Sequence, residues 1–142
     1  MRRTLVLIVL LLQATLAVAG VCTASSPEEF APFFSKFSDD KHFAVSRTVF
    51  PLRALKWEYG IDSQGKDESA PRRFRIPKAK YETTPSLSSS MKEHGLTSRV
   101  KGVSTRSAIV EVFKEGTDWL TSHHFKRIGR CWFLYEYQDH SL

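Results

Sequence analysis

The chain has 142 residues, with 21 Lys and Arg against 15 Asp and Glu, which gives a formal net charge of +6. This length is enough for one hydrophobic core and short for two. The charge is only mildly basic, and it excludes neither a protein partner nor a small ligand.

The first residues have the layout of a secretory signal peptide. Two arginines precede an apolar run over residues 5–12, and small residues end at Ala19 in the pattern of a cleavage site. The apolar run is well short of the roughly 20 residues that a membrane-spanning helix needs. We therefore expect a signal peptide over residues 1–19, a single domain over residues 20–142, and a periplasmic or secreted location. Exported proteins seldom meet nucleic acid, so no nucleic-acid partner is expected.

Two cysteines lie in the part that would remain after cleavage, Cys22 and Cys131. In an oxidising compartment such a pair is more naturally a disulfide than half of a metal site or a nucleophile. For a loop of this length the chain-entropy estimate is at most about 4.7 kcal/mol. Two alternatives stay open for Cys22. One is a lipid added by the bacterial lipoprotein pathway, which is the only way in which we would expect the protein to attach to a membrane. The other is a free or removed thiol.

An aromatic stripe predicts the first helix. Its members recur at the i, i+3, i+4, i+7 spacing of one helical face and are Phe30, Phe33, Phe34 and Phe37. The hydroxyl of Ser26 before a proline predicts that the helix begins there, and its aromatic face is expected to lie in the core. Asp39 and Asp40 predict a second cap, followed by a short helix that ends before Thr48.

An arm of two strands is expected next. Residues 48–59 are rich in β-branched and aromatic side chains and predict a strand with Pro51 near its start or on an edge. Residues 60–71 read as a polar loop. Residues 72–81 then predict a second strand, which Pro77 would confine to a sheet edge.

The second half of the chain predicts a sheet. Residues 82–95 indicate a loop with at most a short helix closed by Gly95. Four strand-like runs separated by turn residues follow and predict an antiparallel meander. They cover residues 96–103, 107–116, 118–129 and 131–139. Helices first and sheet afterwards indicate an α+β fold with N-terminal helices packed on one face of a curved antiparallel sheet.

The adjacent histidines invite a catalytic or metal-binding interpretation, which strand geometry opposes. A two-residue turn beginning at Gly129 predicts a hairpin in which His124 lies opposite Tyr135. Neighbouring residues of a strand point to opposite faces, so His123 and His124 cannot hold one ion. Cys131 shares a face with His124 but lies roughly 13 Å away at about 3.3 Å per residue. A nucleophile and its base need about 3 Å. We therefore expect no catalytic residue, no metal and no cofactor.

The densest positive run is the candidate surface for a partner. If this run is a strand, Arg73 and Arg75 share one face, while Lys78 and Lys80 lie on the other. Such a run is typical of a solvated edge strand. It also suits an acidic protein partner, because surface charges raise the association rate and select the partner. The candidate partner-binding residues are Arg72, Arg73, Arg75, Lys78 and Lys80.

The order of helices, arm and meander resembles the nuclear transport factor 2-like superfamily, a cone-shaped α+β fold. Two segments carry the resemblance. FAPFFSKFSDDKHFAVSRTVFPL, residues 30–52, resembles the opening of a small family of secreted bacterial proteins of uncharacterised function. TDWLTSHHFKRIGRCWFLYEYQD, residues 117–139, is similar to the superfamily's terminal hairpin. The superfamily contains isomerases and dehydratases as well as members without catalysis, and no catalytic motif of it matches this chain.

The resemblance and the expected export favour a non-enzymatic, protein-binding domain. The specific hypothesis is a periplasmic immunity protein that neutralises a secreted antibacterial toxin. One alternative is a small-molecule-binding domain or pocket enzyme of the same fold, and another is an oligomeric envelope module, for example a homodimer through the sheet face. A deep cavity with a buried carboxylate or histidine would favour the pocket alternative. A cone filled by the phenylalanines would oppose it.

Overall fold

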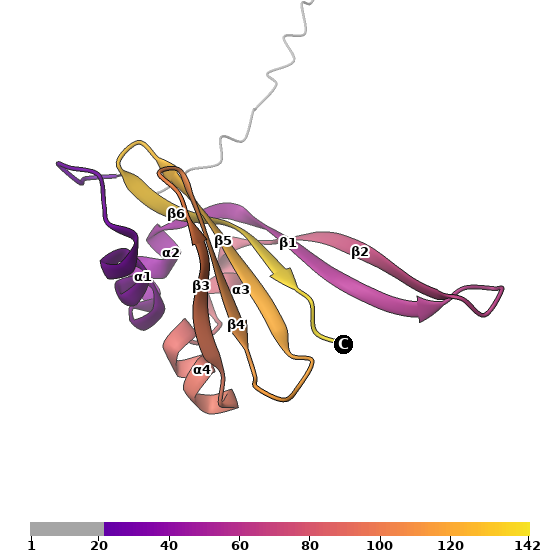
Figure 1. Ribbon diagram of the computed structural model, residues 1–142. Helices are drawn as coiled ribbons and strands as arrows, with labels where there is room; N and C mark the ends of the chain where they lie inside the picture. The colour runs from indigo at the N-terminus through magenta and orange to yellow at the C-terminus, as the bar shows by residue number, and fades with distance from the viewer. Residues whose placement is uncertain (1–21) are drawn as a thin grey trace, which may run out of the picture.

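The computed structural model describes residues 22–142, so the expected signal peptide lies outside the described residues. The described chain forms short helices and a sheet (Figure 1). In chain order the elements are α1 (Phe30–Asp39), α2 (Lys41–Ser46), β1 (Thr48–Ile61), β2 (Asp67–Ile76), α3 (Lys78–Glu82), α4 (Leu87–His94), β3 (Thr97–Val103), β4 (Ser107–Phe113), β5 (Leu120–Ile128) and β6 (Cys131–Asp139). Within residues 22–142, no helix is long and apolar enough to cross a membrane.

All six strands belong to one curved sheet, in the order β2-β1-β6-β5-β4-β3. The meander β3-β4-β5-β6 pairs antiparallel throughout, as predicted. β1 joins the meander by pairing parallel to β6, and β2 pairs antiparallel to β1 at the outer edge. The helices pack on one face of this sheet, which we call the concave face. The predicted α+β class is confirmed.

The phenylalanine stripe of α1 fills one end of the concave face. Phe37 is 1% exposed, and its ring meets the fully buried ring of Phe125 edge-on at 5.2 Å between centroids. Phe30 meets the indole of Trp132 in the same manner, also at 5.2 Å. The prediction that this helical face lies in the core is confirmed. Truncating one such ring to alanine typically costs about 3–5 kcal/mol, so the stripe holds α1 to β5 and β6.

The predicted start of α1 at Ser26 was wrong, because Glu28 is held outside the helix. The backbone N–H of Glu28 donates to the Arg130 carbonyl at 2.9 Å. Its own carbonyl accepts from the Trp132 indole at 3.0 Å and from the Arg127 guanidinium at 2.7 Å. These bonds keep the segment extended beside the β5–β6 turn, and the helix begins only at Phe30, after Glu29 in an extended conformation.

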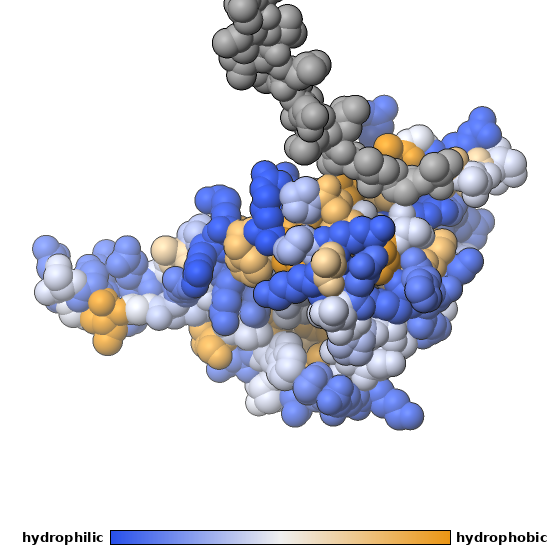
Figure 2. All heavy atoms as spheres, turned by 180° about the vertical axis from the view of Figure 1, so that it is seen from behind, coloured by the Kyte–Doolittle hydropathy of each residue, from blue (hydrophilic) through white to orange (hydrophobic). Residues whose placement is uncertain are grey.

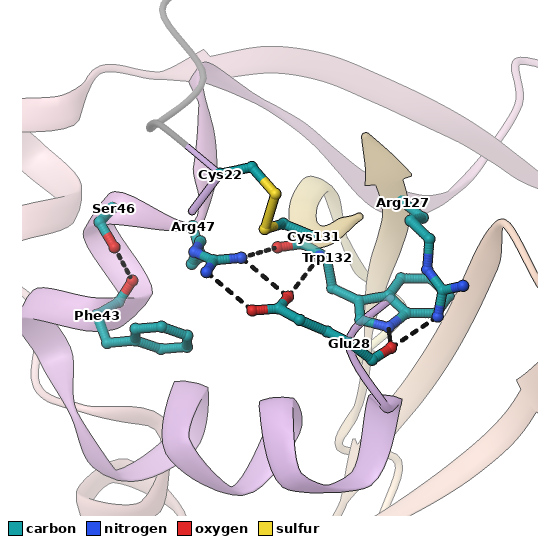
Figure 3. Close-up of polar contacts among 8 residues, drawn as sticks. All are labelled: Cys22, Glu28, Phe43, Ser46, Arg47, Arg127, Cys131 and Trp132. Atoms are coloured by element: carbon teal, nitrogen blue, oxygen red, sulfur yellow. Dashed lines mark hydrogen bonds and ion pairs between the residues drawn. A yellow bond between two sulfur atoms is a disulfide. The ribbon is translucent and has the colours of Figure 1, made fainter. Parts of the chain in front are cut away.

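The Glu28 carboxylate completes a cluster that we call the Glu28 anchor, formed by Glu28, Arg47, Arg127 and Trp132 (Figure 3). Its two oxygens accept from the two terminal nitrogens of Arg47, each at 2.9 Å. One oxygen also accepts from the backbone N–H of Trp132 at 2.9 Å. The Arg47 side chain is only 9% exposed. The ion pair is therefore nearly buried, and it is bidentate, since both carboxylate oxygens accept a hydrogen bond from the guanidinium.

The predicted cap of the second helix is confirmed. The side chain of Asp40 accepts from the backbone N–H of Phe43 at 2.9 Å, and α2 ends at Ser46, before Thr48. Pro51 lies near the start of β1, as expected. The ladder with β2 begins only after it, at Leu52, and the β6 ladder is irregular there, so the missing N–H of Pro51 removes no ladder bond.

The long polar loop expected over residues 60–71 was wrong, because most of these residues extend the two strands. The turn spans only residues 62–66, where the Asp62 carboxylate accepts from the backbone N–H groups of Gln64 and Lys66. Gly65 supplies the left-handed conformation, with φ +79°. Both faces of this hairpin end are solvated, so polar side chains do not prevent strand formation, and their pattern resembles that of a loop.

The hairpin end projects from the molecule as an arm, residues 57–71 (Figure 1). Pairing of β1 with β6 stops at Lys56 and Asp139, so the arm pairs only with itself. Its surface is mainly hydrophilic with one apolar patch in view (Figure 2), and Ile61 and Tyr59 are 73% and 52% exposed.

The strand predicted over residues 72–81 was wrong in its second half. β2 ends at Ile76, and Pro77 begins a helical turn instead, as the residue directly before α3. Proline lacks the N–H that a strand needs and is well tolerated at a helix start. Lys78 and Lys80 therefore lie on a helix and not on the strand face of Phe74. The expectation of a short helix closed by Gly95 is confirmed, with Gly95 in the left-handed conformation.

The predicted disulfide is confirmed. Cys22 and Cys131 are joined, with their Cα atoms 5.7 Å apart. The bond ties the start of the described chain to the first residue of β6, next to the Glu28 anchor (Figure 3). A disulfide is compatible with an oxidising location.

We predict that Glu28→Ala destabilises the protein by about 3 kcal/mol, because it leaves the nearly buried guanidinium of Arg47 without its counter-charge. The measurement is the free energy of unfolding in urea. Glu29→Ala is the matched control, since Glu29 is not buried and its side chain caps nothing. Equal stability of the two variants would contradict a central role for the anchor.

Candidate ligand-binding cavity

A cavity of about 270 Å³ lies between the helices and the concave face. It begins where the phenylalanine stripe ends, at Phe37, and extends under α2, α3 and α4. Its walls are mainly apolar. The lining side chains come from all four helices and from β1, β2, β5 and β6, and they include Ala44, Leu52, Ile76, Leu87 and Leu134. The cone is therefore not filled by the phenylalanines.

His123 and Tyr137 form the sheet side of this cavity. Their rings meet edge-on, with centroids 5.3 Å apart. His123 lies in β5 on the face that also carries Phe125, while His124 on the other face hydrogen bonds to Ser122 at 3.0 Å. The expectation that the two histidines lie on opposite faces is confirmed.

A β-bulge places Tyr137 beside His123. The predicted pairing of His124 with Tyr135 was wrong, because the ladder shifts by one residue between His124 and Phe125, and His124 lies opposite Glu136. Tyr135 is the extra residue on β6. Without this bulge Tyr137 would face the opposite side of the sheet from His123, whereas the shift pairs the two directly.

The Nδ1 atom of His123 is buried and has no hydrogen-bond partner among the described residues. Burial lowers the pKa of His123 to about 4, and the positive charge of His124 acts in the same direction. Burial likewise raises the pKa of Tyr137 to about 12, helped by the negative charge of Asp139. At neutral pH the cavity therefore offers an uncharged imidazole and a protonated phenol.

Lys41 and Tyr81 lie at the helical side of the cavity. The ammonium of Lys41 is 3.8 Å from the centroid of the Tyr81 ring and donates to the Thr84 hydroxyl at 2.8 Å. Partial burial lowers the pKa of Lys41, and Glu82 acts in the opposite direction. Burial raises the pKa of Tyr81. This side of the cavity therefore carries a stacked, partly desolvated cation.

The residues of the predicted basic run do not lie together on one surface. Arg72 pairs with Glu58 at 3.3 Å on the arm, and Lys78 pairs with Glu82 at 3.7 Å along α3. Lys80 lines the cavity. The run is therefore no single surface.

Arg73 and Arg75 lie together on the convex face, the side of the sheet opposite the helices. Arg53 of β1 lies directly opposite Arg75 and pairs with Glu136 at 3.1 Å. These side chains line a shallow hollow of about 370 Å³. Arg73 and Arg75 form no ion pair with any residue of the described range, so this hollow presents positive charge to solvent.

The comparisons with known proteins show the fold. No family model matches the chain, and no curated protein matches it. An NTF2-like protein from Bacteroides fragilis NCTC 9343 superposes with a TM-score of 0.58 and 18% identity, over 84% of this chain and 50% of that protein. A cystatin-like protein from Bacteroides caccae ATCC 43185 superposes with a TM-score of 0.51 and 20% identity, over 81% of this chain and 78% of that protein.

This chain therefore has the cone-shaped α+β fold of the nuclear transport factor 2-like superfamily. It spans half the length of the Bacteroides fragilis protein. The narrower resemblance to a small family of secreted bacterial proteins stays a prediction. At these identities the likeness establishes the fold alone.

We predict that His123→Phe raises the free energy of unfolding by about 1 kcal/mol at pH 7, because it removes a buried polar group that has no partner. His124→Phe is the matched control and should lower stability, since His124 hydrogen bonds to Ser122. Both are measured by urea unfolding. A destabilised His123→Phe protein would contradict an unpartnered imidazole.

The comparison of His123→Phe with the wild-type protein also predicts how stability depends on pH. The folded pKa of His123 is about 4, below its ordinary value of 6.5, so the unfolded chain takes up the proton first. The free energy of unfolding of the wild-type protein should fall as pH drops from about 6.5 to about 4, and above pH 6.5 His123 should cause no such loss. His123→Phe cannot take up this proton, so its stability relative to the wild-type protein should increase toward pH 4. A constant difference between pH 7 and pH 4 would contradict the assignment.

Proposed function

We propose that the protein is an exported domain that binds a small, mainly apolar molecule in the concave-face cavity. The observation that carries this proposal is an apolar space of about 270 Å³ lined by an uncharged imidazole, that of His123, whose buried Nδ1 has no hydrogen-bond partner among the described residues. For comparison, an engineered apolar cavity of about 150 Å³ binds benzene. The space beside His123 is thus large enough for an aromatic ring with a short substituent.

The energetics support a ligand. Leaving a buried polar group without a partner costs about 1–3 kcal/mol, so a bound molecule that supplies the partner gains this free energy. A ligand that brings one hydroxyl or carbonyl to His123 would satisfy the imidazole, while its apolar part covers the walls. As proposed, the protein binds this ligand without transforming it, and a bound probe should be recovered unchanged.

The test uses a cavity-filling variant. Ser90 of α4 lines the cavity, and Ser90→Phe should occupy part of it without exposing apolar surface. We predict that 3-phenylpropanol, a neutral molecule with one ring and one hydroxyl, binds the wild-type protein. Ser90→Phe should weaken this binding at least tenfold and leave the melting temperature unchanged or raised.

Glu93→Phe is the control, because Glu93 is an exposed position of the same helix. Isothermal titration calorimetry measures both variants. No heat of binding for the wild-type protein, or equal affinities of the two variants, would overturn the proposal.

A second candidate function is recognition of an acidic protein, specifically as a periplasmic immunity protein against a secreted toxin. The observation that favours it is the hollow on the convex face, where Arg73 and Arg75 carry positive charge toward solvent. Surface charge of one sign steers association with a partner of opposite sign. A homodimer through the sheet face would cover this surface and stays a prediction.

Survival during attack by sibling cells tests this candidate. Cells that lack the gene should be killed by their parent strain and rescued by the wild-type gene. The double variant Arg73→Glu, Arg75→Glu should not rescue them. The double variant Lys92→Glu, Lys114→Glu changes the net charge equally, lies away from the hollow and should rescue. Undiminished resistance of the deletion strain would rule this candidate out.

A further inference from the structure

The charged side chains of the cavity are all of one sign. Lys41 and Lys80 both line it, whereas its lining contains no Asp or Glu among the described residues. Lys41 lies on α2 and Lys80 on α3, so the two cations approach the cavity from neighbouring helices. An apolar cavity with two cationic side chains in its lining favours a ligand that carries negative charge at one end.

Lys41 is partly buried but forms no ion pair among the described residues. Its ammonium is partly buried, with one contact to the Tyr81 ring at 3.8 Å and one to the Thr84 hydroxyl at 2.8 Å. The nearest acidic influence is Glu82, whose carboxylate pairs with Lys78 at 3.7 Å. No carboxylate among the described residues lies within ion-pair distance of Lys41. An ammonium has three donors, so at least one remains for a ligand.

Lys36 provides a comparison outside the cavity. Its ammonium also lies over an aromatic ring, that of Phe43, at 4.5 Å. Lys36, however, is exposed on α1 and does not line the cavity. Of these two stacked lysines, only Lys41 faces the apolar space.

We infer that the ligand of the cavity is an amphipathic carboxylate whose acid group binds the Lys41 ammonium, with Lys80 adding a second positive charge, and whose apolar body lies against Leu52, Leu134 and Tyr137. This inference rests on the proposed function, since it names the chemistry of the molecule in that same cavity. A carboxylate supplies the anion that Lys41 lacks, and charge-assisted hydrogen bonds are roughly twice as strong as neutral ones.

The first experiment needs no variant. 3-Phenylpropanoate and 3-phenylpropanamide share one carbon skeleton and differ in the charge of the head group. We expect the wild-type protein to bind the acid about tenfold more tightly than the amide at pH 7, as a hydrogen bond to a charged group implies. Isothermal titration calorimetry measures both affinities. Equal affinities, or tighter binding of the amide, would overturn the inference.

The second experiment assigns the effect to Lys41. Lys41→Met keeps an unbranched side chain of nearly the same length and removes its charge, and it should abolish the preference for the acid while leaving amide binding within about twofold. Lys36→Met is the matched control and should preserve the preference. Lys41→Arg keeps the positive charge and should retain most of the preference for the acid over the amide. A preference that survives Lys41→Met, or that Lys36→Met removes equally, would overturn the role of Lys41.

The outcomes separate this inference from the proposed function. In one outcome 3-phenylpropanol and the amide bind, Ser90→Phe weakens the binding of both, and the acid binds no more tightly than the amide. The cavity then binds ligands, and the carboxylate inference alone fails. If none of the three molecules binds the wild-type protein, both fail. The folded state of each variant is checked by its melting temperature, and the comparison of acid with amide in the wild-type protein is independent of any substitution.

Discussion

The Glu28 anchor positions the rest of the cone. One residue uses its N–H, its carbonyl and both carboxylate oxygens to bind the β5–β6 turn region, the end of α2 and the first residues of β6. The anchor lies at one end of the sheet, directly before α1 (Figure 3). Because Arg47 closes α2 and Glu28 precedes α1, their ion pair sets where both helices cross the concave face. The disulfide ties the preceding segment to the same place.

This placement leaves the two ends of the concave face unequal. Near the anchor, the aromatic side chains of α1 fill the space against Phe125 and Trp132. Farther along, two of the helical positions that line the cavity carry small side chains, Ala44 of α2 and Ser90 of α4. Small side chains at these two positions do not fill the space between the helices and the sheet, and the larger neighbours Tyr81 and Leu87 line this space without closing it. The cavity is thus a result of where the large and small residues lie.

Local patterns in the sequence predicted the parts of the fold that near neighbours determine. The period of the α1 phenylalanines, the Asp40 cap and the turn at Gly129 each depend on residues a few positions apart. The start of α1 could not be predicted in this way, because Glu28 is held by partners about a hundred residues later in the chain. The arm was predicted, but its residues 60–71 were predicted as a loop, because a hairpin with two solvated faces has no alternating pattern.

The cavity residues escaped prediction for a related reason. Lys41, Tyr81, His123 and Tyr137 come from four different elements, and no motif joins them. The bulge at Tyr135 is decisive, since a regular ladder would turn Tyr137 to the other face. Strand alternation did separate His123 from His124 and thereby argued against a shared metal ion. The same alternation directs His123 toward the helices, where a polar side chain without a partner weakens the fold unless another molecule completes its hydrogen bonds. Retaining an imidazole there, in the same cavity as a cation that forms no ion pair among the described residues, is easier to explain by binding than by stability.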